Sequence, residues 1–303
     1  MDTTGPHAPA AATGNHRRNM FLVWAATLLV LAALIVLATV RTVPAPHTDF
    51  LAVTPWQPQK QPGAAPASKA QPGPAVDLAA GIQRILSENG SHRIGVAVAD
   101  TRDGNLQSYG DVSEYVAAST AKILTAAAYY HLVETGEKSL DTPLGAFDTA
   151  FQLEAMVNTS SDDSWLLLMQ DIGYPRLVEY AASLGITYDP EQNLLTPPDM
   201  ARLLQELSTG KLLNAEHTEE LLGYMQQTND EDLIPAAVAP DITVHHKYGV
   251  VEGYVHDAAI LSSGGHSYAV VIYTWGPDDA DGEARLDLIH DLTHQITAAL
   301  FGR

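Results

Sequence analysis

The sequence contains no cysteine among its 303 residues. This absence excludes disulfide bonds, thiolate metal sites and a cysteine nucleophile, and it leaves the redox compartment of the protein open. Positive charge is also scarce, because 16 lysines and arginines stand against 36 aspartates and glutamates, which gives a formal net charge of −20. A chain this acidic is unsuited to binding a polyanion, so we expect no nucleic-acid partner.

Charge is missing altogether from residues 20–40, which also lack glycine and proline. A run of this length can cross a bilayer as one helix. Arg17 and Arg18 precede the run and only Arg41 follows it closely, a bias that favours a cytoplasmic N-terminus. We therefore predict a short cytoplasmic segment over 1–19 and a single-pass anchor in the cell membrane, with the rest of the chain outside the cytoplasm. A cleaved signal peptide is the alternative, although the apolar run is longer than usual and its end, Ala38-Thr39-Val40, is not the small-x-small pattern that a signal peptidase prefers.

Residues 41–76 are rich in proline, alanine, glutamine and glycine and show no apolar periodicity. This composition predicts a semi-extended linker that holds the next part of the chain away from the membrane. Helical and strand patterns begin at residue 77 and continue to the C-terminus. Residues 77–303 are therefore expected to form one globular domain.

The apolar spacing of this domain predicts helices and strands in a definite order. A first helix over 77–89 and a hairpin over 94–109 precede a helical block, which is followed by three strands and a last helix. The helical block comprises residues 119–136, 155–172, 176–184, 198–207 and 215–227. The strands cover residues 242–248, 256–261 and 268–275, and the last helix covers 280–300. This order is typical of an α/β (α+β) domain in which helices flank an antiparallel sheet and an all-helical lobe is inserted.

Ser119 and Lys122 form a Ser-x-x-Lys pattern at the start of a predicted helix. Residues three apart lie on the same face of a helix, one turn from each other. A lysine whose pKa is lowered by burial or by nearby positive charge can remove the proton of a serine, which then attacks a carbonyl carbon. Taken alone, the pattern favours a serine that caps the helix beside a solvated lysine.

Two further polar clusters follow downstream. Ser160-Ser161-Asp162-Asp163 opens a helical run, where such residues commonly cap the helix. Lys247-Tyr248-Gly249 ends a predicted strand, where a lysine is usually solvated. Trp165 follows the first cluster with helical spacing to apolar neighbours and is expected in the core.

Twelve histidines raise two further possibilities, a metal site and a Ser-His-Asp triad. His245 and His246 are adjacent on a predicted strand and point to opposite faces, which disfavours one ion held by both. His256 and Asp257 could serve a triad, but no Gly-x-Ser-x-Gly pattern surrounds Ser119. We expect neither a metal nor another cofactor.

In their order and spacing, the three clusters resemble the motifs of the class A serine β-lactamases and of the related penicillin-interacting, transpeptidase-like proteins. That family carries Ser-x-x-Lys, Ser-Asp-Asn and Lys-Thr-Gly. The resemblance extends over residues 78–300. It implies an antiparallel five-stranded sheet flanked by helices, with an all-helical lobe, and a serine hydrolase that opens an amide through an acyl-enzyme.

The same resemblance implies a role for each matching residue. Ser119 would accept the acyl group, and Lys122 would help to activate it. Ser160 would move the proton toward the leaving nitrogen. Lys247 would tune Ser160 and hold the carboxylate of the substrate.

Several positions differ from the family pattern or admit two assignments. Asp162 stands where the motif has asparagine, and Tyr248 stands where it has a small hydroxyl residue. Asp162 and Tyr248 would line the substrate site together with Gly249 and Val251, and the Val251 N–H would complete an oxyanion hole. The alternative register over residues 161–163 matches the middle aspartate of the second motif but shifts it by one residue against its flanks.

The largest departure lies between the fourth and fifth predicted helices. Class A enzymes have a longer omega loop there, with a glutamate that activates the deacylating water. Residues 186–195 form only a short connection, and Glu191 is its sole glutamate. The resemblance therefore leaves three functions open: a class A type β-lactamase, a peptidoglycan D-Ala-D-Ala peptidase or transpeptidase that traps penicillin, and a non-catalytic domain that binds cell wall. The expected substrate is a β-lactam or a peptidoglycan stem peptide, and the expected assembly is a monomer.

Overall fold

The structure, a computed structural model, describes residues 76–277 and 282–302. The described residues all belong to one compact unit, Ala70–Arg303. The predicted cytoplasmic segment, the predicted anchor over 20–40 and nearly all of the predicted linker lie outside the described residues. Among the helices of the described part, none combines the length and apolar character that a membrane span requires.

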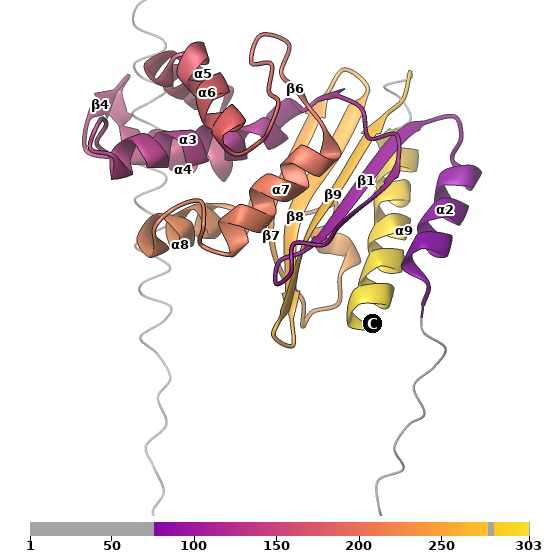
Figure 1. Ribbon diagram of the computed structural model, residues 1–303. Helices are drawn as coiled ribbons and strands as arrows, with labels where there is room; N and C mark the ends of the chain where they lie inside the picture. Colours follow the sequence, from indigo (N-terminus) through magenta and orange to yellow (C-terminus); the bar gives the residue numbers. More distant parts are fainter. Residues whose placement is uncertain (1–75, 278–281, 303) are drawn as a thin grey trace, which may run out of the picture. The chain divides into compact units, whose positions relative to one another are not determined.

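A five-stranded antiparallel sheet with strand order β2-β1-β9-β8-β7 forms the centre of the domain (Figure 1). The strands are β1 (Arg93–Asp100), β2 (Leu106–Gly110), β7 (Thr243–Val251), β8 (Tyr254–Ser263) and β9 (His266–Trp275). The predicted five-stranded sheet is thereby confirmed. Because β7 is an edge strand, the backbone groups on one of its sides remain available to line a site.

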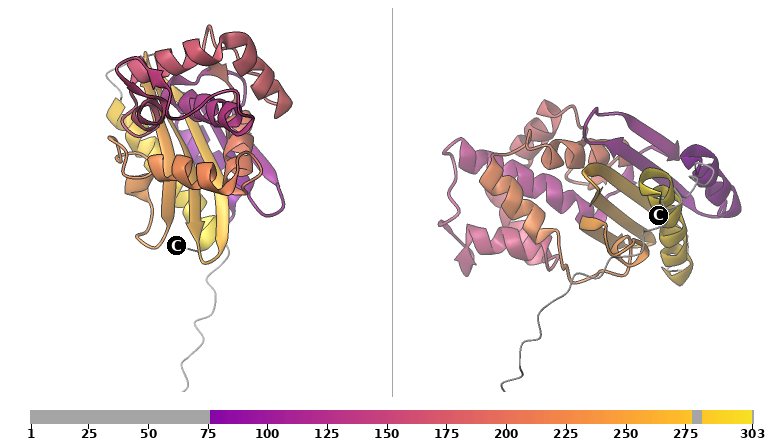
Figure 2. Two further views of the ribbon diagram at one scale, coloured as in Figure 1. Left: turned by 90° about the vertical axis from the view of Figure 1, so that its left-hand side faces the viewer. Right: turned by 90° about the horizontal axis from the view of Figure 1, so that it is seen from below.

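Two helices from opposite ends of the domain, α2 (Leu78–Glu88) and α9 (Gly282–Phe301), cover one face of the sheet (Figures 1 and 2). The two-residue alternation of β1 separates the two faces. Val96 and Val98 pack in the core beneath α2 and α9, whereas Ala97 and Ala99 belong to the core on the opposite face.

The opposite face carries the helical lobe. It begins with a two-residue strand, β3 (Tyr115–Val116), and a 3₁₀ turn, η1 (Ala118–Ala121), and the helices are α3 (Lys122–Glu134), α4 (Thr149–Val157), α5 (Asp162–Ile172), α6 (Tyr174–Ser183), α7 (Pro197–Ser208) and α8 (Ala215–Tyr224). The remaining short elements are β4 (Pro143–Leu144), β5 (Phe147–Asp148), β6 (Leu194–Leu195), which pairs with β3, and the 3₁₀ turn η2 (Pro235–Ala237). Helix α3 is buried on nearly all sides, so it forms the centre of the lobe.

Two predicted helices differ from the structure. Residues 118–121 form a 3₁₀ turn, so the α-helix begins at Lys122 rather than at Ser119. The helix predicted over 155–172 is broken into α4 and α5, with Ser160 in the left-handed region at φ 59°. Ser161 restarts the helix, because its side chain accepts a hydrogen bond from the Ser164 N–H, and such local bonds compete with helical continuation.

Candidate active site

Ser119 lies in the turn η1, where the chain passes from β3 into α3. The preceding residue, Ala118, has a left-handed backbone at φ 50°. This turn packs directly on β7, since a Cβ atom added to Gly249 would lie 2.9 Å from the Ser119 nitrogen. Ser119 is half-buried and lines a pocket of about 470 Å³, together with residues of α5 and with the end of β7. Glycine at position 249 is what allows the strand and the turn to approach so closely.

Lys122 is fully buried one turn beyond Ser119. Its ammonium donates hydrogen bonds to the Ser160 carbonyl at 2.8 Å, to Ser160 Oγ at 3.3 Å and to Asp162 Oδ1 at 2.6 Å. Burial lowers the pKa of Lys122, and the Asp162 carboxylate opposes that shift. Among the described residues no hydrogen bond joins this ammonium to the Ser119 hydroxyl. Bonds of this kind commonly tighten only when substrate is bound.

Lys247 reaches the same serine from β7. It is fully buried, and its ammonium donates to Ser160 Oγ at 3.0 Å and to the Tyr248 carbonyl at 3.2 Å. Burial and the neighbouring Lys122 charge lower the pKa of Lys247 to about 7. Of the two serines considered for the second motif, Ser160 lies between the lysines, whereas Ser161 caps α5.

The backbone of β7 decides which N–H group can complete an oxyanion hole. Alternate N–H groups of an edge strand point toward its neighbour and away from it. The His246 N–H donates to the Met225 carbonyl at 2.7 Å, outside the sheet, and the register with β8 is unbroken to the Val251–Tyr254 pair. Val250 has the same parity as His246, so its N–H faces the open edge. The N–H of Val251 faces β8, and the expected oxyanion role of Val251 is corrected to Val250.

The histidines do not form a triad with Ser119. The His256 ring donates from Nε2 to the Val116 carbonyl at 3.0 Å and accepts from the Thr274 N–H at Nδ1, and burial lowers its pKa to about 4. Asp257 instead lies 3.0 Å from the ring of His246. His256 is therefore a neutral core residue at pH 7, with both ring nitrogens occupied.

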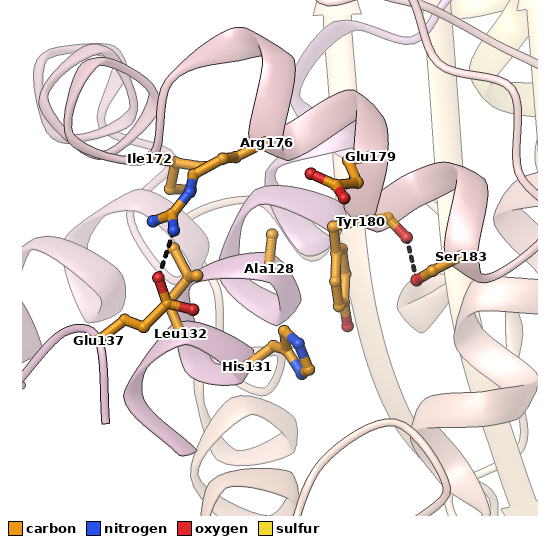
Figure 3. Close-up of a pocket in the computed structure, with 9 residues that line it drawn as sticks. All are labelled: Ala128, His131, Leu132, Glu137, Ile172, Arg176, Glu179, Tyr180 and Ser183. Carbon is orange, nitrogen blue, oxygen red and sulfur yellow. Dashed lines mark hydrogen bonds and ion pairs between the residues drawn. The ribbon is translucent and has the colours of Figure 1, made fainter. Parts of the chain in front are cut away.

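A second cavity, of about 340 Å³, lies between α3 and α6 (Figure 3). Glu137 and Arg176 form an ion pair at its edge, and the rings of His131 and Tyr180 lie 5.2 Å apart. No lysine lines this cavity, and its only serine, Ser183, donates its hydroxyl to a backbone carbonyl. This cavity therefore offers no serine–lysine pair among the residues that line it.

Comparison with known proteins identifies the family to which this chain belongs. The sequence profile of the β-lactamase enzyme family (Beta-lactamase2) matches residues 77–154 and 149–300, nearly the whole of the described domain. The chain belongs to the β-lactamase enzyme family.

Three proteins similar to this β-lactamase family member share a quarter or less of its residues in the aligned regions. A β-lactamase of Proteus vulgaris is 24% identical over 249 residues, which cover 70% of this chain and 92% of that protein. An ancestral class A β-lactamase has a TM-score of 0.68 at 23% identity and covers 74% of this chain and 100% of its own. A variant of PBP-A, solved as its acyl-enzyme complex with penicillin G, has a TM-score of 0.66 at 20% identity over 76% of this chain and 100% of its own. These structures share the fold.

The short loop between α6 and α7 places no carboxylate among the residues that line the pocket. Asp189 turns back on its own loop, where its carboxylate accepts hydrogen bonds from the N–H groups of Glu191 and Gln192 at 2.9 and 3.0 Å. Glu191 itself is exposed. Among the described residues that line the pocket, the carboxylates are Asp162 and Asp163, and both come from α5.

Prediction from the sequence missed Asn193 and the position of Trp165 at this pocket. Asn193 has φ 54°. Its side-chain amide donates to the Ala118 carbonyl at 3.0 Å and its backbone carbonyl accepts from the Ala117 N–H at 2.7 Å, so it fixes the entry to η1. An asparagine in a short loop is a signal for such a left-handed position. Trp165 packs against the core as predicted, but it also lines the pocket and donates to the Thr125 hydroxyl at 2.9 Å.

The contact between Gly249 and η1 predicts the effect of one methyl group. Gly249→Ala should displace the Ser119 turn and slow acylation of Ser119 by about 100-fold, the usual cost of losing one oxyanion donor. The measurement is the rate of labelling by a fluorescent penicillin, with circular dichroism as a check on folding. Gly223→Ala is the matched control, because nothing lies within 4 Å of the added atom. Equal labelling rates in both variants would contradict the account of this contact.

Proposed function

We propose that this protein opens the amide bond of β-lactams at Ser119 and that its acyl-enzyme is hydrolysed slowly. The observation that carries the proposal is the hydroxyl of Ser160, held between two buried lysines beside the Ser119 turn. Burying two ammonium groups is costly, and a domain that only bound cell wall would gain nothing from that arrangement. Membership of the β-lactamase enzyme family supports the same reaction class.

The residues of the pocket divide the acylation step among them. The Lys122 ammonium first releases a proton to solvent and separates from Asp162. Ser119 Oγ then attacks the carbonyl carbon, and the neutral Lys122 amine takes the hydroxyl proton. The N–H groups of Ser119 and Val250 stabilise the oxyanion. The proton then passes through the Ser160 hydroxyl to the leaving nitrogen. Lys247, whose pKa is about 7, can donate a proton to the Ser160 hydroxyl at neutral pH to replace the one transferred.

Deacylation lacks an evident base. A water molecule that attacks an acyl-enzyme needs a group to accept its proton, and the short loop supplies no carboxylate to the pocket. The carboxylates that line the pocket, Asp162 and Asp163, both come from α5, and Asp162 is paired with Lys122 at 2.6 Å before the reaction begins. The same observation favours a second candidate function, a peptidoglycan peptidase or transpeptidase that β-lactams inhibit by trapping. The structural likeness to PBP-A in an acyl-enzyme complex is consistent with stable acylation.

We also propose that residues 20–40 anchor the protein in the cell membrane and that 41–76 act as a tether. The support is compositional, a charge-free apolar run followed by a segment rich in proline and glutamine. The full chain should sediment with membranes and be released by detergent but not by alkali, whereas a variant that lacks residues 1–40 should stay in the supernatant. A full chain that alkali releases with its N-terminus intact would exclude the anchor.

Labelling with a fluorescent penicillin tests the proposed chemistry. The full chain should acquire one covalent label that survives for minutes to hours, with only slow turnover of a chromogenic cephalosporin. Ser119→Ala should abolish the label, because the acyl group would have no acceptor. Rapid cephalosporin turnover would instead indicate an efficient β-lactamase with a base outside the loop, and unchanged labelling of Ser119→Ala would exclude Ser119 as the nucleophile.

A further inference from the structure

Lys247, the residue expected to hold the substrate carboxylate, is sealed from solvent. Its exposed fraction is 0%. Its ammonium has three N–H donors, and it contacts Ser160 Oγ at 3.0 Å, the Tyr248 carbonyl at 3.2 Å and the ring of Tyr248 at 3.9 Å from the centroid. A carboxylate binds an ammonium by direct hydrogen bonds. Because the Lys247 side chain has no exposed surface in this conformation, its ammonium does not offer a hydrogen bond to a substrate carboxylate.

The ring of Tyr248 is fixed in its covering position at both ends. At one end it lies against the Lys247 ammonium, an arrangement stabilised by a cation–π interaction. At the other end its hydroxyl donates to Asn229 Oδ1 at 2.7 Å. The Asn229 amide in turn donates to the Thr159 carbonyl at 3.0 Å, next to Ser160. The cover is thus bound to the loop that carries the second motif.

No lysine, arginine or histidine is among the described residues that line the pocket, so no other cation is placed there to bind a carboxylate. Among the described residues that line it, the charged ones are Asp162 and Asp163, and both are exposed. The apolar lining residues are Val116, Ala118, Trp165, Leu166, Val250 and Val251. Because the Asp162 carboxylate is paired with Lys122, Asp163 is the acidic group that adds to the apolar lining, and this lining favours a neutral or amine-bearing group over a carboxylate.

We infer that Tyr248 sets the specificity of this site by withdrawing Lys247 from carboxylate recognition. The protein therefore accepts neutral or amine-bearing acyl donors as readily as donors with a free carboxylate beside the scissile amide. Lys247 keeps its bond to Ser160 and serves proton transfer alone, and its lowered pKa suits that role. The inference rests on the proposed acylation of Ser119.

The test compares one fluorescent penicillin with its methyl ester, using the labelling rate of the full chain. The unmodified protein should label with acid and ester at rates within about threefold of each other. Tyr248→Thr should uncover Lys247 and make the acid react at least about tenfold faster than the ester, the effect of gaining one charge-assisted hydrogen bond. Tyr248→Phe is the matched control, because it keeps the covering ring and loses only the bond to Asn229. Its two rates should stay within about threefold.

An acid preference of tenfold or more in the unmodified protein would overturn the inference, even where a Tyr248 variant is unstable. Equal rates in a folded Tyr248→Thr protein would likewise exclude Tyr248 as the determinant. Absence of label with both probes would refute the proposed acylation. The inference about Tyr248 would then be tested by the binding of acid and ester. Calorimetry on Ser119→Ala should give similar dissociation constants for acid and ester. Tenfold tighter binding of the acid than of the ester, or no binding of either, would contradict the inference about Tyr248.

Discussion

The hydroxyl of Ser160 accepts hydrogen bonds from two buried lysines, and the arrangement of the domain serves to bring these three side chains together. Lys122 comes from the central helix of the lobe and Lys247 from the edge strand of the sheet. Removing two ammonium groups from water lowers stability unless other groups compensate. Here the Asp162 carboxylate and backbone carbonyls provide part of that compensation, and the remaining cost appears as lowered pKa values.

The backbone around these side chains is strained where they meet. Ala118 and Ser160 have left-handed conformations, which are costly for residues other than glycine and asparagine, and both adjoin the pocket or its lysines. Neighbouring contacts hold the strained segments in place, as when the Asn158 amide donates to the carbonyls of Tyr224 and Gln226. Such strain is typical of sites whose geometry is fixed by the surrounding fold rather than by local preference.

The sequence was sufficient for the five-stranded sheet and for the serines and lysines that the structure brings together. Periodicity located the strands, and the order of three motifs indicated Ser119, Lys122, Ser160 and Lys247. Prediction from the sequence failed at details that depend on contacts between segments far apart in the chain. The break at residues 158–161 was hidden because the apolar spacing continues across it, and the choice between successive N–H groups on β7 requires the strand register. The covering position of Tyr248 depends on Asn229, which no local pattern connects to it.

An NMR titration of the lysine side chains tests the central claim most directly. With lysine labelled at the ε position and signals assigned through Lys122→Arg and Lys247→Arg, each ammonium reports its own protonation. The account predicts that Lys247 titrates near pH 7 and that Lys122 titrates below the ordinary lysine value of about 10.4. Ordinary titration of both lysines would contradict it, because they would then lie in water rather than beside one buried serine.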